Sequence, residues 1–404
     1  EIQLGDWSSD VCSSDLYYGG DLIGKSGIER AYEAELRGEA GEEALEVDAR
    51  GRKVRVLDSR PAAKGTDLHL TLDMGVQKLA VELLKNYKGA IVAMDVKNGA
   101  ILALASSPTY DNNPLAWGVS GREWNAIVRD PNKPMLDRCI SGVYPPASTF
   151  KAFMSLAALE EDVITSSTSF SCSGAIRLAS HTFRCWRRSG HGSMNVLTAL
   201  QHSCDVYFYQ VGIRMGIDRI LKWARRFRLG EPTGIDLPGE SAGVIAGPDW
   251  KRRRFKENWY QGDTVNYSIG QGYLLMTPLQ IARVYAAIAN GGRLVTPHLS
   301  NLSYRPPVDM HLTPAKVALV QQGLDYVVQR GTGARAGKFG VTVAGKTGTA
   351  QNAHGDDHAL FAGYAPAEAP RYVVVAIVEA GKHGSSVTSP IVGELPAGDR
   401  KSVV

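Results

Sequence analysis

Residues 144–151 read YPPASTFK and lead into an apolar run that continues to residue 157. Pro-Pro suits the entry of an α-helix but not its interior, so the run predicts a helix that begins near Ser148. Residues three apart on a helix share a face, which brings the Ser148 hydroxyl towards the Lys151 amine. A serine is a good nucleophile only when a base takes its proton, and an amine can do this. The start of a helix also offers N–H groups to a developing oxyanion.

Two further segments carry polar side chains between apolar ones. Residues 346–349 read KTGT and follow the alternating residues 341–344, which places them on a strand. Gly348 leaves room for another backbone, while the lysine and the last threonine suit a substrate carboxylate. Ser203-Cys204-Asp205 interrupts an apolar helical stretch and suits a loop that turns two polar side chains into a cleft. Alone each motif is weak, because about one S-x-x-K is expected by chance and surface turns have similar sequences.

The order S-x-x-K, S-x-[ND], K-T-G is the signature of penicillin-binding proteins and serine β-lactamases. Residues 142–151 and 346–351 resemble class B penicillin-binding proteins, and residues 186–192, 260–263 and 270–273 resemble their elongation-specific members. The resemblance covers roughly residues 21–395. It implies an α+β transpeptidase fold, shared with serine β-lactamases, in which an antiparallel sheet is flanked by helices.

The resemblance also implies the roles of individual residues. Ser148 would attack the D-Ala-D-Ala carbonyl of a peptidoglycan stem peptide, Lys151 would take its proton, and Ser203 and Asp205 would relay protons and hold the substrate amide. The N–H groups of Ser148 and Thr349 would form the oxyanion hole, and an amine of a second stem peptide would resolve the acyl-enzyme. β-Lactams would acylate the same serine. Asp205 departs from the Asn that is usual in the wider superfamily, although elongation-type enzymes often carry Asp. The implied substrate-binding strand consists of Lys346, Thr347, Gly348 and Thr349.

The pattern along the chain independently predicts a mixed fold. Asn98-Gly99 between two apolar runs predicts a hairpin over residues 89–105. Capping residues followed by proline open helices at residues 277 and 313, and strands return at residues 341–344, 360–364 and 372–378. Strands from both ends of the chain with helices between them indicate one antiparallel sheet. A short helix over residues 28–36 and a β-leaning stretch over residues 46–57 precede this domain.

This order of predicted helices and strands also predicts the domain boundaries. Residues 17–65 read as the remnant of an N-terminal pedestal or dimerisation domain, and residues 66–398 as a transpeptidase domain that stops before a C-terminal helix found in relatives. Residues 1–16 and 399–404 resemble translated sequencing adapter, which would contribute nothing to the fold, with a natural polar tail as the alternative. We therefore expect the natural protein to extend beyond both ends.

Three cysteines and a histidine cluster in the sequence, and such a set can form a closed tetrahedral zinc site. Spacing alone is poor evidence, but elongation-type relatives can carry a metal here with ligands that match by position. A structural zinc is thus the hypothesis, and a disulfide plus one free thiol is the alternative. Cys139 is expected in the core, and Cys12 lies in the adapter-like head. His181 and His202 lie nearby in the sequence but are expected to be ordinary surface or core histidines and not ligands. The predicted ligands are Cys172, Cys185, His191 and Cys204.

Composition excludes several other classes of function. Of 404 residues, 44% are apolar and 21% charged, an ordinary globular balance, and the net charge of +4 does not suggest nucleic acid. The basic run over residues 251–254 is expected to be a solvated loop. No stretch spans a bilayer, but the resemblance implies a protein on the periplasmic face of the inner membrane, anchored by an N-terminal helix that this sequence lacks. The implied partners are stem peptides, β-lactams, a SEDS-family glycan polymerase and other rod-complex proteins.

Three alternative functions stay open at this point. A β-lactamase needs a base for rapid deacylation, and no obvious one is present. A β-lactam sensor domain is acylated without turnover but is usually shorter. A septal class B transpeptidase is the nearest alternative, which absence of the metal cluster would favour.

Overall fold

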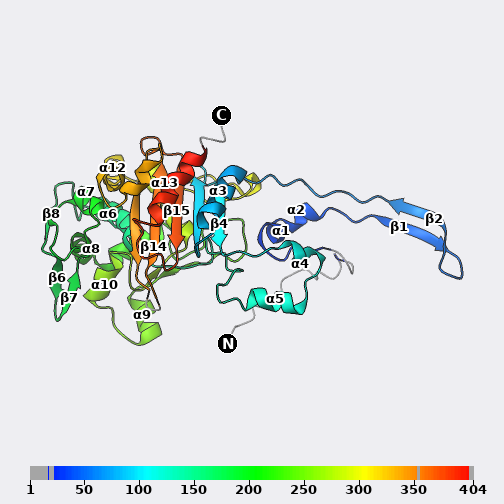
Figure 1. Cartoon of the computed structure of the whole chain (residues 1–404), viewed down its shortest axis with the longest axis horizontal. Helices are drawn as coiled ribbons and strands as arrows, with labels where there is room; N and C mark the ends of the chain where they lie inside the picture. Colours follow the sequence, from blue (N-terminus) through cyan, green and yellow to red (C-terminus); the bar gives the residue numbers. More distant parts are fainter. Residues whose placement is uncertain (1–16, 18–21, 353–354, 400–404) are drawn as a thin grey trace. The chain divides into compact units, whose positions relative to one another are not determined.

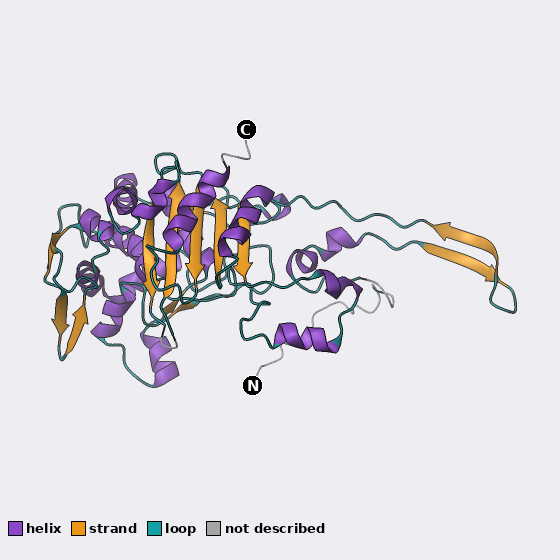
Figure 2. Cartoon of the chain, viewed as in Figure 1, coloured by secondary structure: helices purple, strands orange, loops and turns teal. Residues whose placement is uncertain are grey.

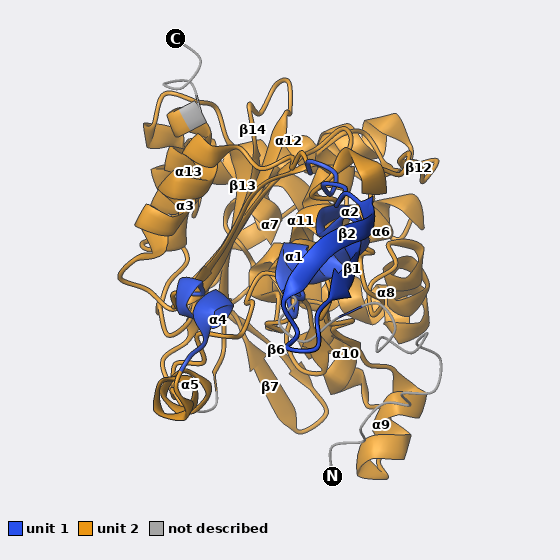
Figure 3. Cartoon of the chain, turned by 90° about the vertical axis from the view of Figure 1, so that its right-hand side faces the viewer, with its two compact units in different colours: residues 1–68, 112–119 blue, residues 69–111, 120–404 orange. Residues whose placement is uncertain are grey.

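The computed structural model describes residues 17, 22–352 and 355–399. The two adapter-like segments therefore fall outside the described residues, except for Asp399 at the end of the last helix. Within the described part, no helix is both long enough and apolar enough to cross a membrane. The chain divides into two units, residues 1–68 with 112–119 and residues 69–111 with 120–404 (Figure 3).

The larger unit is organised around one antiparallel sheet of five strands, in the order β13-β14-β15-β3-β4 (Figure 1). Strands β3 and β4 form the hairpin predicted at Asn98-Gly99, and the other three come from the end of the chain. The prediction of one sheet built from both ends is confirmed. The strand bounds are β3 Gly89–Asp95, β4 Ile101–Ser107, β13 Ala344–Ala350, β14 His358–Ala365 and β15 Tyr372–Val378.

Helices cover both faces of this sheet (Figure 2). Helices α3 (Met74–Leu84) and α13 (Thr388–Asp399) pack on one face, and α11 (Pro278–Ala289) packs on the other. Successive side chains of a strand point to opposite faces. Because both faces are covered, strand β15 is almost continuously apolar and buried.

Helix α13 overturns the expectation that the chain stops before a C-terminal helix. Its Val392 and Leu395 are buried in the core beneath it. Helical periodicity did not predict this helix, because it contains Pro396 and two glycines, which disfavour helix formation. The glycines permit close packing: a Cβ at Gly393 would lie 2.2 Å from the Ala336 carbonyl oxygen. Tertiary contacts thus supply what helix propensity lacks.

A largely helical region continues from the sheet and carries most of the predicted catalytic residues. Helix α6 (Phe150–Glu160) is buried over nearly its whole length and packs against α8 (Asp205–Arg226), which is interrupted at Gly216. The helices that accompany them are α7 Val196–Gln201, α9 Pro248–Phe255, α10 Gln261–Tyr267 and α12 Pro314–Arg330, and the same unit also contains α5 Gly121–Val128. Short two-stranded ladders complete the unit: β5 Phe170–Cys172 with β8 Gly192–Met194, β6 Ala175–Leu178 with β7 His181–Arg184, β9 Val244–Ile245 with β10 Leu274–Leu275, and β11 Arg293–Leu294 with β12 Val308–Asp309.

The basic run at residues 251–254 is not the solvated loop that was expected. It lies in helix α9, where Lys251 is buried and its Nζ atom lies 2.7 Å from Asp263 Oδ2. Only Lys251 is used inside the fold, whereas Arg252, Arg253 and Arg254 are exposed to solvent on the helix.

The smaller unit contains short elements. The helix expected over residues 28–36 is divided at Tyr32 into α1 (Gly27–Ala31) and α2 (Glu33–Arg37). The β-leaning stretch forms a hairpin of β1 (Glu42–Val47) and β2 (Lys53–Arg60), whose residues are all exposed. The helix α4 (Asn113–Trp117) belongs to the same unit.

Candidate active site and cysteine cluster

Ser148 lies in a 3-10 turn, Ala147–Thr149, that runs directly into helix α6, as the double proline predicted. The preceding residue, Ala147, has a φ of +49°, a conformation that costs an alanine about 1–2 kcal/mol. Its N–H donates to the carbonyl of Gly270 at 2.8 Å. Gly270 must be a glycine here, because a Cβ would lie 2.2 Å from the Ala147 oxygen. The loop at Gly270 therefore supports the strained turn that presents the serine.

Lys151, one turn after Ser148, is fully buried among polar partners. Its Nζ atom donates to Asp205 Oδ1 at 2.7 Å, to the Ser203 carbonyl at 3.0 Å and to Ser203 Oγ at 3.2 Å. Ser203 has a φ of +53° and closes the loop between α7 and α8. The structure thus joins three of the four predicted catalytic residues through one ammonium group.

Asp205 opens helix α8 and bridges two parts of the site. While Oδ1 accepts from Lys151, Oδ2 accepts from the backbone N–H of Trp186 at 2.9 Å. A carboxylate can accept at both oxygens, whereas an Asn amide would present a donor to one of these donors. The Asp in the second motif therefore fits its surroundings better than the commoner Asn.

The predicted substrate-binding residues lie on β13, the edge strand of the sheet, next to the Ser148 turn. This confirms that the K-T-G motif lies on a strand, although the strand begins at Ala344 and excludes residues 341–343. A Cβ at Gly348 would lie 3.2 Å from the Thr149 side chain and 3.4 Å from the Pro146 carbonyl oxygen. Gly348 thus lets the strand approach the nucleophile, as its residue type indicated.

Lys346 is buried on this strand and donates to the Thr347 carbonyl at 3.2 Å. Burial lowers the pKa of Lys346 well below its ordinary value, and repulsion from the Lys151 ammonium lowers it further. An anion placed between this lysine and the Ser148 turn would favour the protonated amine and so raise the pKa of Lys346 again. The strand is therefore suited to bind a carboxylate.

The structure also assigns supporting residues that the sequence motifs did not indicate. Tyr144 donates its hydroxyl to Glu379 Oε1 at 2.8 Å, and the buried Arg138 donates its Nε to the same oxygen at 2.8 Å. Gln271 donates its amide to the Thr349 carbonyl at 3.3 Å. These contacts join residues far apart in the sequence. Tyr144 and Gln271 lie within motifs quoted for the resemblance, but nothing in the sequence indicated their partners.

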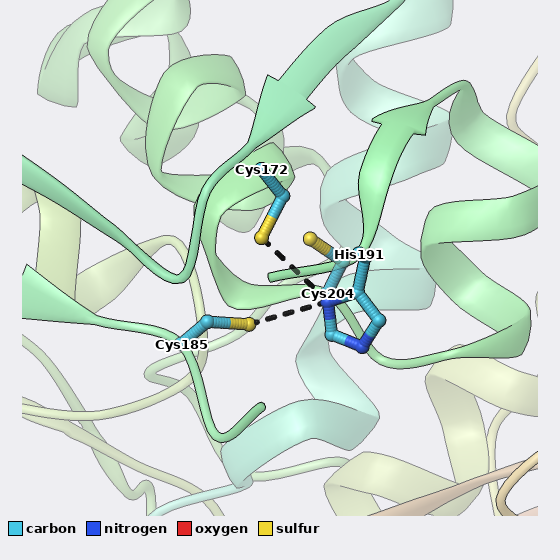
Figure 4. A group of neighbouring side chains, drawn as sticks. All are labelled: Cys172, Cys185, His191 and Cys204. Atoms are coloured by element: carbon cyan, nitrogen blue, oxygen red, sulfur yellow. Dashed lines mark hydrogen bonds between the residues drawn. The ribbon is translucent and has the colours of Figure 1, made fainter. Parts of the chain in front are cut away.

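The four predicted metal ligands converge on one point (Figure 4). Cys172 and Cys185 place Sγ atoms 3.6 and 3.5 Å from Nδ1 of His191, and one ligand atom from each of the four residues lies within 4.8 Å of the others. Tetrahedral zinc with ordinary Zn–S and Zn–N lengths requires S···N separations of about 3.5 Å. The cysteine cluster (Cys172, Cys185, His191 and Cys204) therefore has the shape and donor set of a closed zinc site.

Two of the thiols share a hydrogen bond within the cysteine cluster. The bond from the Cys204 thiol lowers the pKa of Cys185 to about 5 and raises that of Cys204. The spare histidines lie outside the group of ligand atoms: the His202 ring stacks on His191 at 6.0 Å, and His181 is exposed on β7. Cys139 is fully buried in the core, as expected.

Family models match both units of the chain. A model described as "Penicillin binding protein transpeptidase domain" matches residues 89–397, and one described as "Penicillin-binding Protein dimerisation domain" matches residues 8–70. The second match begins within the segment that resembles adapter sequence and continues through the expected pedestal remnant. The two models are consistent with a pedestal followed by a transpeptidase domain.

Individual relatives agree with the family models. Peptidoglycan D,D-transpeptidase MrdA of Haemophilus influenzae is 41% identical over 93% of this chain, which covers 62% of that protein. The enzyme of the same name from Escherichia coli K12 is 38% identical over 90% of this chain, with 63% of its length covered. The chain thus spans somewhat less than two thirds of these curated relatives.

Solved structures resemble the fold over nearly the whole chain. Helicobacter pylori penicillin-binding protein 2, solved in complex with MreC, has a TM-score of 0.88 and 34% identity over 95% of this chain and 73% of its own. Pseudomonas aeruginosa PBP2 in complex with WCK 5153 has a TM-score of 0.85 and 33% identity over 96% of this chain and 85% of its own. Together with the family models, these similarities show that the chain belongs to the class B penicillin-binding proteins and is similar to penicillin-binding protein 2.

Proposed function

We propose that this chain is the catalytic part of a peptidoglycan D,D-transpeptidase that cross-links stem peptides during cell elongation and is acylated at Ser148 by β-lactams. The observation that carries the proposal is the buried Lys151 ammonium group, held by Ser203 and Asp205 one turn after the serine. The MrdA relatives are named peptidoglycan D,D-transpeptidases, which supports the activity. The convergence of the four cysteine-cluster residues favours an elongation-type enzyme over a septal one, because absence of that cluster would have favoured the septal enzyme.

In the proposed acylation, the Lys151 ammonium group of the resting site first loses a proton to solvent. The resulting neutral amine then takes the proton of Ser148 Oγ as this oxygen attacks the carbonyl of the penultimate D-Ala. The N–H groups of Ser148 and Thr349 bind the oxyanion. Ser203 Oγ, 3.2 Å from Lys151 Nζ, passes a proton to the leaving nitrogen as the peptide bond breaks. An ester to Ser148 and a free D-Ala result, and an amine of a second stem peptide then attacks the ester.

The substrate carboxylate binds along β13 in this proposal. Lys346 supplies the cation, and Thr347 and Thr349 supply hydroxyl groups. The low pKa of Lys346 that burial produces rises again when the carboxylate binds, because an opposite charge favours the protonated amine. Binding therefore favours the charged form of the lysine that holds the substrate.

The deciding experiment labels the purified chain with a fluorescent penicillin beside a Ser148→Ala variant and a Ser155→Ala control. Ser155 is also buried on α6, but its hydroxyl bonds to the Lys151 carbonyl. A stable label on wild type and control, absent from Ser148→Ala, is expected. A label that disappears within minutes would instead indicate a β-lactamase, and absence of D-Ala release from a stem-peptide donor would indicate a sensor.

Zinc in the cysteine cluster is part of the same proposal. Cys172, Cys185, His191 and Cys204 would hold the ion, which would supply structural cross-linking between the β5–β8 segment and the loop of Ser203. Support comes from the separations of 3.5–3.6 Å between sulfur and Nδ1. Metal analysis should give one zinc per chain with three thiols released on chelation. Well under one equivalent, with two thiols recovered only after reduction, would favour a disulfide.

The proposed location is the periplasmic face of the bacterial inner membrane, with a SEDS-family glycan polymerase and rod-complex proteins as partners. Support comes from relatives: one similar structure is PBP2 with MreC, and another is described as coordinating polymerisation and cross-linking in a peptidoglycan synthase complex. The N-terminal anchor would precede this sequence. Fractionation of cells that produce the full-length natural protein should place it in the inner membrane, and recovery in the cytoplasm would contradict the location.

A further inference from the structure

The loop that follows helix α12 bridges two catalytic motifs. We call residues Arg330, Gly331, Thr332 and Gly333 the bridging loop. On one side, the Gln201 amide donates to the Arg330 carbonyl at 3.3 Å, and the Thr332 N–H donates to the Gln201 carbonyl at 3.4 Å. Gln201 ends helix α7, two residues before Ser203. The bridging loop is therefore attached to the loop of the second motif.

On its other side, the bridging loop reaches the substrate-binding strand. The hydroxyl oxygens of Thr332 and Thr347 lie 2.9 Å apart, and Lys346 Nζ donates to the same Thr347 oxygen at 3.4 Å. Thr347 is almost fully buried, so few other groups can orient its hydroxyl. The Thr347 oxygen thus has two neighbours that can donate to it.

Glycines make this close approach possible. A Cβ on Gly331 would lie 2.5 Å from the Gln201 carbonyl oxygen, and one on Gly333 would lie 3.1 Å from the Phe361 ring. A side chain at either position would push the loop away from α7 or from the sheet. The sequence G-T-G at residues 331–333 therefore has a steric reason.

We infer that Thr332 is a positioning residue that donates its hydroxyl proton to Thr347, held in place by Gln201. A hydroxyl has two acceptor sites and one proton. With Thr332 and Lys346 filling both acceptor sites, the Thr347 proton is directed to a third partner, the carboxylate of the bound donor peptide or β-lactam. The inference rests on the proposed function, because that function supplies the carboxylate.

The test compares Thr332→Val, which keeps the shape but removes the hydroxyl, with Thr332→Ser, which keeps the hydroxyl. Acylation is followed with a penicillin as free acid and as methyl ester, resolving the dissociation constant from the acylation rate. Thr332→Val should weaken binding of the free acid about five- to tenfold, the worth of one ordinary hydrogen bond. The methyl ester should be affected little, the acylation rate should hold, and Thr332→Ser should behave as wild type.

Gln201→Met provides an independent variant, with Gln322→Met on the exposed face of α12 as its control. Gln201→Met should also weaken binding of the free acid more than binding of the methyl ester, whereas the control should bind both as wild type does. Equal losses for acid and ester, or no loss in Thr332→Val at an unchanged thermal midpoint, would overturn the inference alone. A wild-type chain that takes no penicillin label would refute the proposed function, and this inference with it.

Discussion

The backbone N–H of Trp186 lies 2.9 Å from Oδ2 of Asp205, the carboxylate whose other oxygen contacts Lys151. Trp186 directly follows Cys185, a member of the cysteine cluster. The segment that contains the cluster is therefore hydrogen-bonded to the group that holds the proposed base. The indole N–H of Trp186 also donates to the His202 carbonyl at 3.0 Å, which is a second hydrogen bond between this segment and the loop of Ser203.

Asp205→Asn should slow acylation by penicillin. The amide would turn an NH₂ group towards either the Trp186 N–H or the Lys151 ammonium, leaving a buried donor unsatisfied. Such a loss costs about 1–3 kcal/mol, so the second-order acylation rate constant should fall about ten- to a hundredfold. Asp249→Asn, at an exposed ion pair with Arg252 on α9, is the control. An Asp205→Asn rate equal to wild type would show that the two-sided acceptor is dispensable.

Removal of zinc should affect stability and acylation together. If the proposed ion holds the cysteine cluster, a chelator frees the segment that positions the Trp186 N–H, and both the thermal midpoint and the acylation rate should fall. Cys172→Ser should reproduce both effects and reduce bound zinc. Cys139→Ala removes a buried thiol outside the cluster, so it should lower the midpoint but keep the zinc content. Unchanged acylation in the zinc-free wild type would contradict the coupling.

Local signals in the sequence predicted most of the fold. The β3–β4 hairpin was predictable because Asn-Gly is a strong turn signal, and the last strands because they are continuous apolar runs. Helix α13 was not, since its prolines and glycines disfavour a helix and only packing on α3 and the sheet stabilises it. The break at Tyr32 between α1 and α2 was equally invisible to helical periodicity.

Local signals likewise predicted part of the site, and the fold decided the rest. Ser148, Lys151 and Lys346 were predictable because each motif carries its chemistry within a few residues. The Trp186 contact was not, because any non-proline residue has a backbone N–H and its use depends on the fold. Tyr144 and Glu379 are 235 residues apart, and only the tertiary fold brings them together. Thr332 was missed for the same reason, although its two flanking glycines were a usable signal.

Glu379→Gln should destabilise the protein at neutral pH. Burial raises the pKa of Glu379, but the hydrogen bond from Tyr144 and the charge of Arg138 outweigh it and hold this pKa below its ordinary value. The stabilisation is therefore present above the unfolded pKa and is lost as the pH falls through the lower folded pKa. Because Glu379 is partly exposed, we expect a loss of about 2–3 kcal/mol at pH 7.

Denaturant unfolding of wild type and Glu379→Gln at several pH values checks this expectation. The difference should be largest at neutral pH and shrink in acid below the ordinary glutamate pKa, where the protonated carboxyl resembles the amide. Glu82→Gln, at an exposed ion pair with Lys85, is the control and should differ little at any pH. A constant difference across the range would assign the loss to packing instead of charge.

Gly270→Ala and Gly272→Ala form a matched pair at the loop that supports Ser148. Both glycines have positive φ, +74° and +76°, so either alanine costs about 1–2 kcal/mol of backbone strain. Only at Gly270 would the new Cβ overlap the Ala147 oxygen, at 2.2 Å; at Gly272 the nearest atom is 3.5 Å away. Overlap of this kind adds about 1–3 kcal/mol and displaces the turn that presents the nucleophile.

Gly270→Ala should therefore unfold at lower denaturant than Gly272→Ala and label far more slowly with penicillin, while Gly272→Ala should label nearly as wild type. Equal labelling of the two variants would mean that the turn holds its strained conformation without the Gly270 loop.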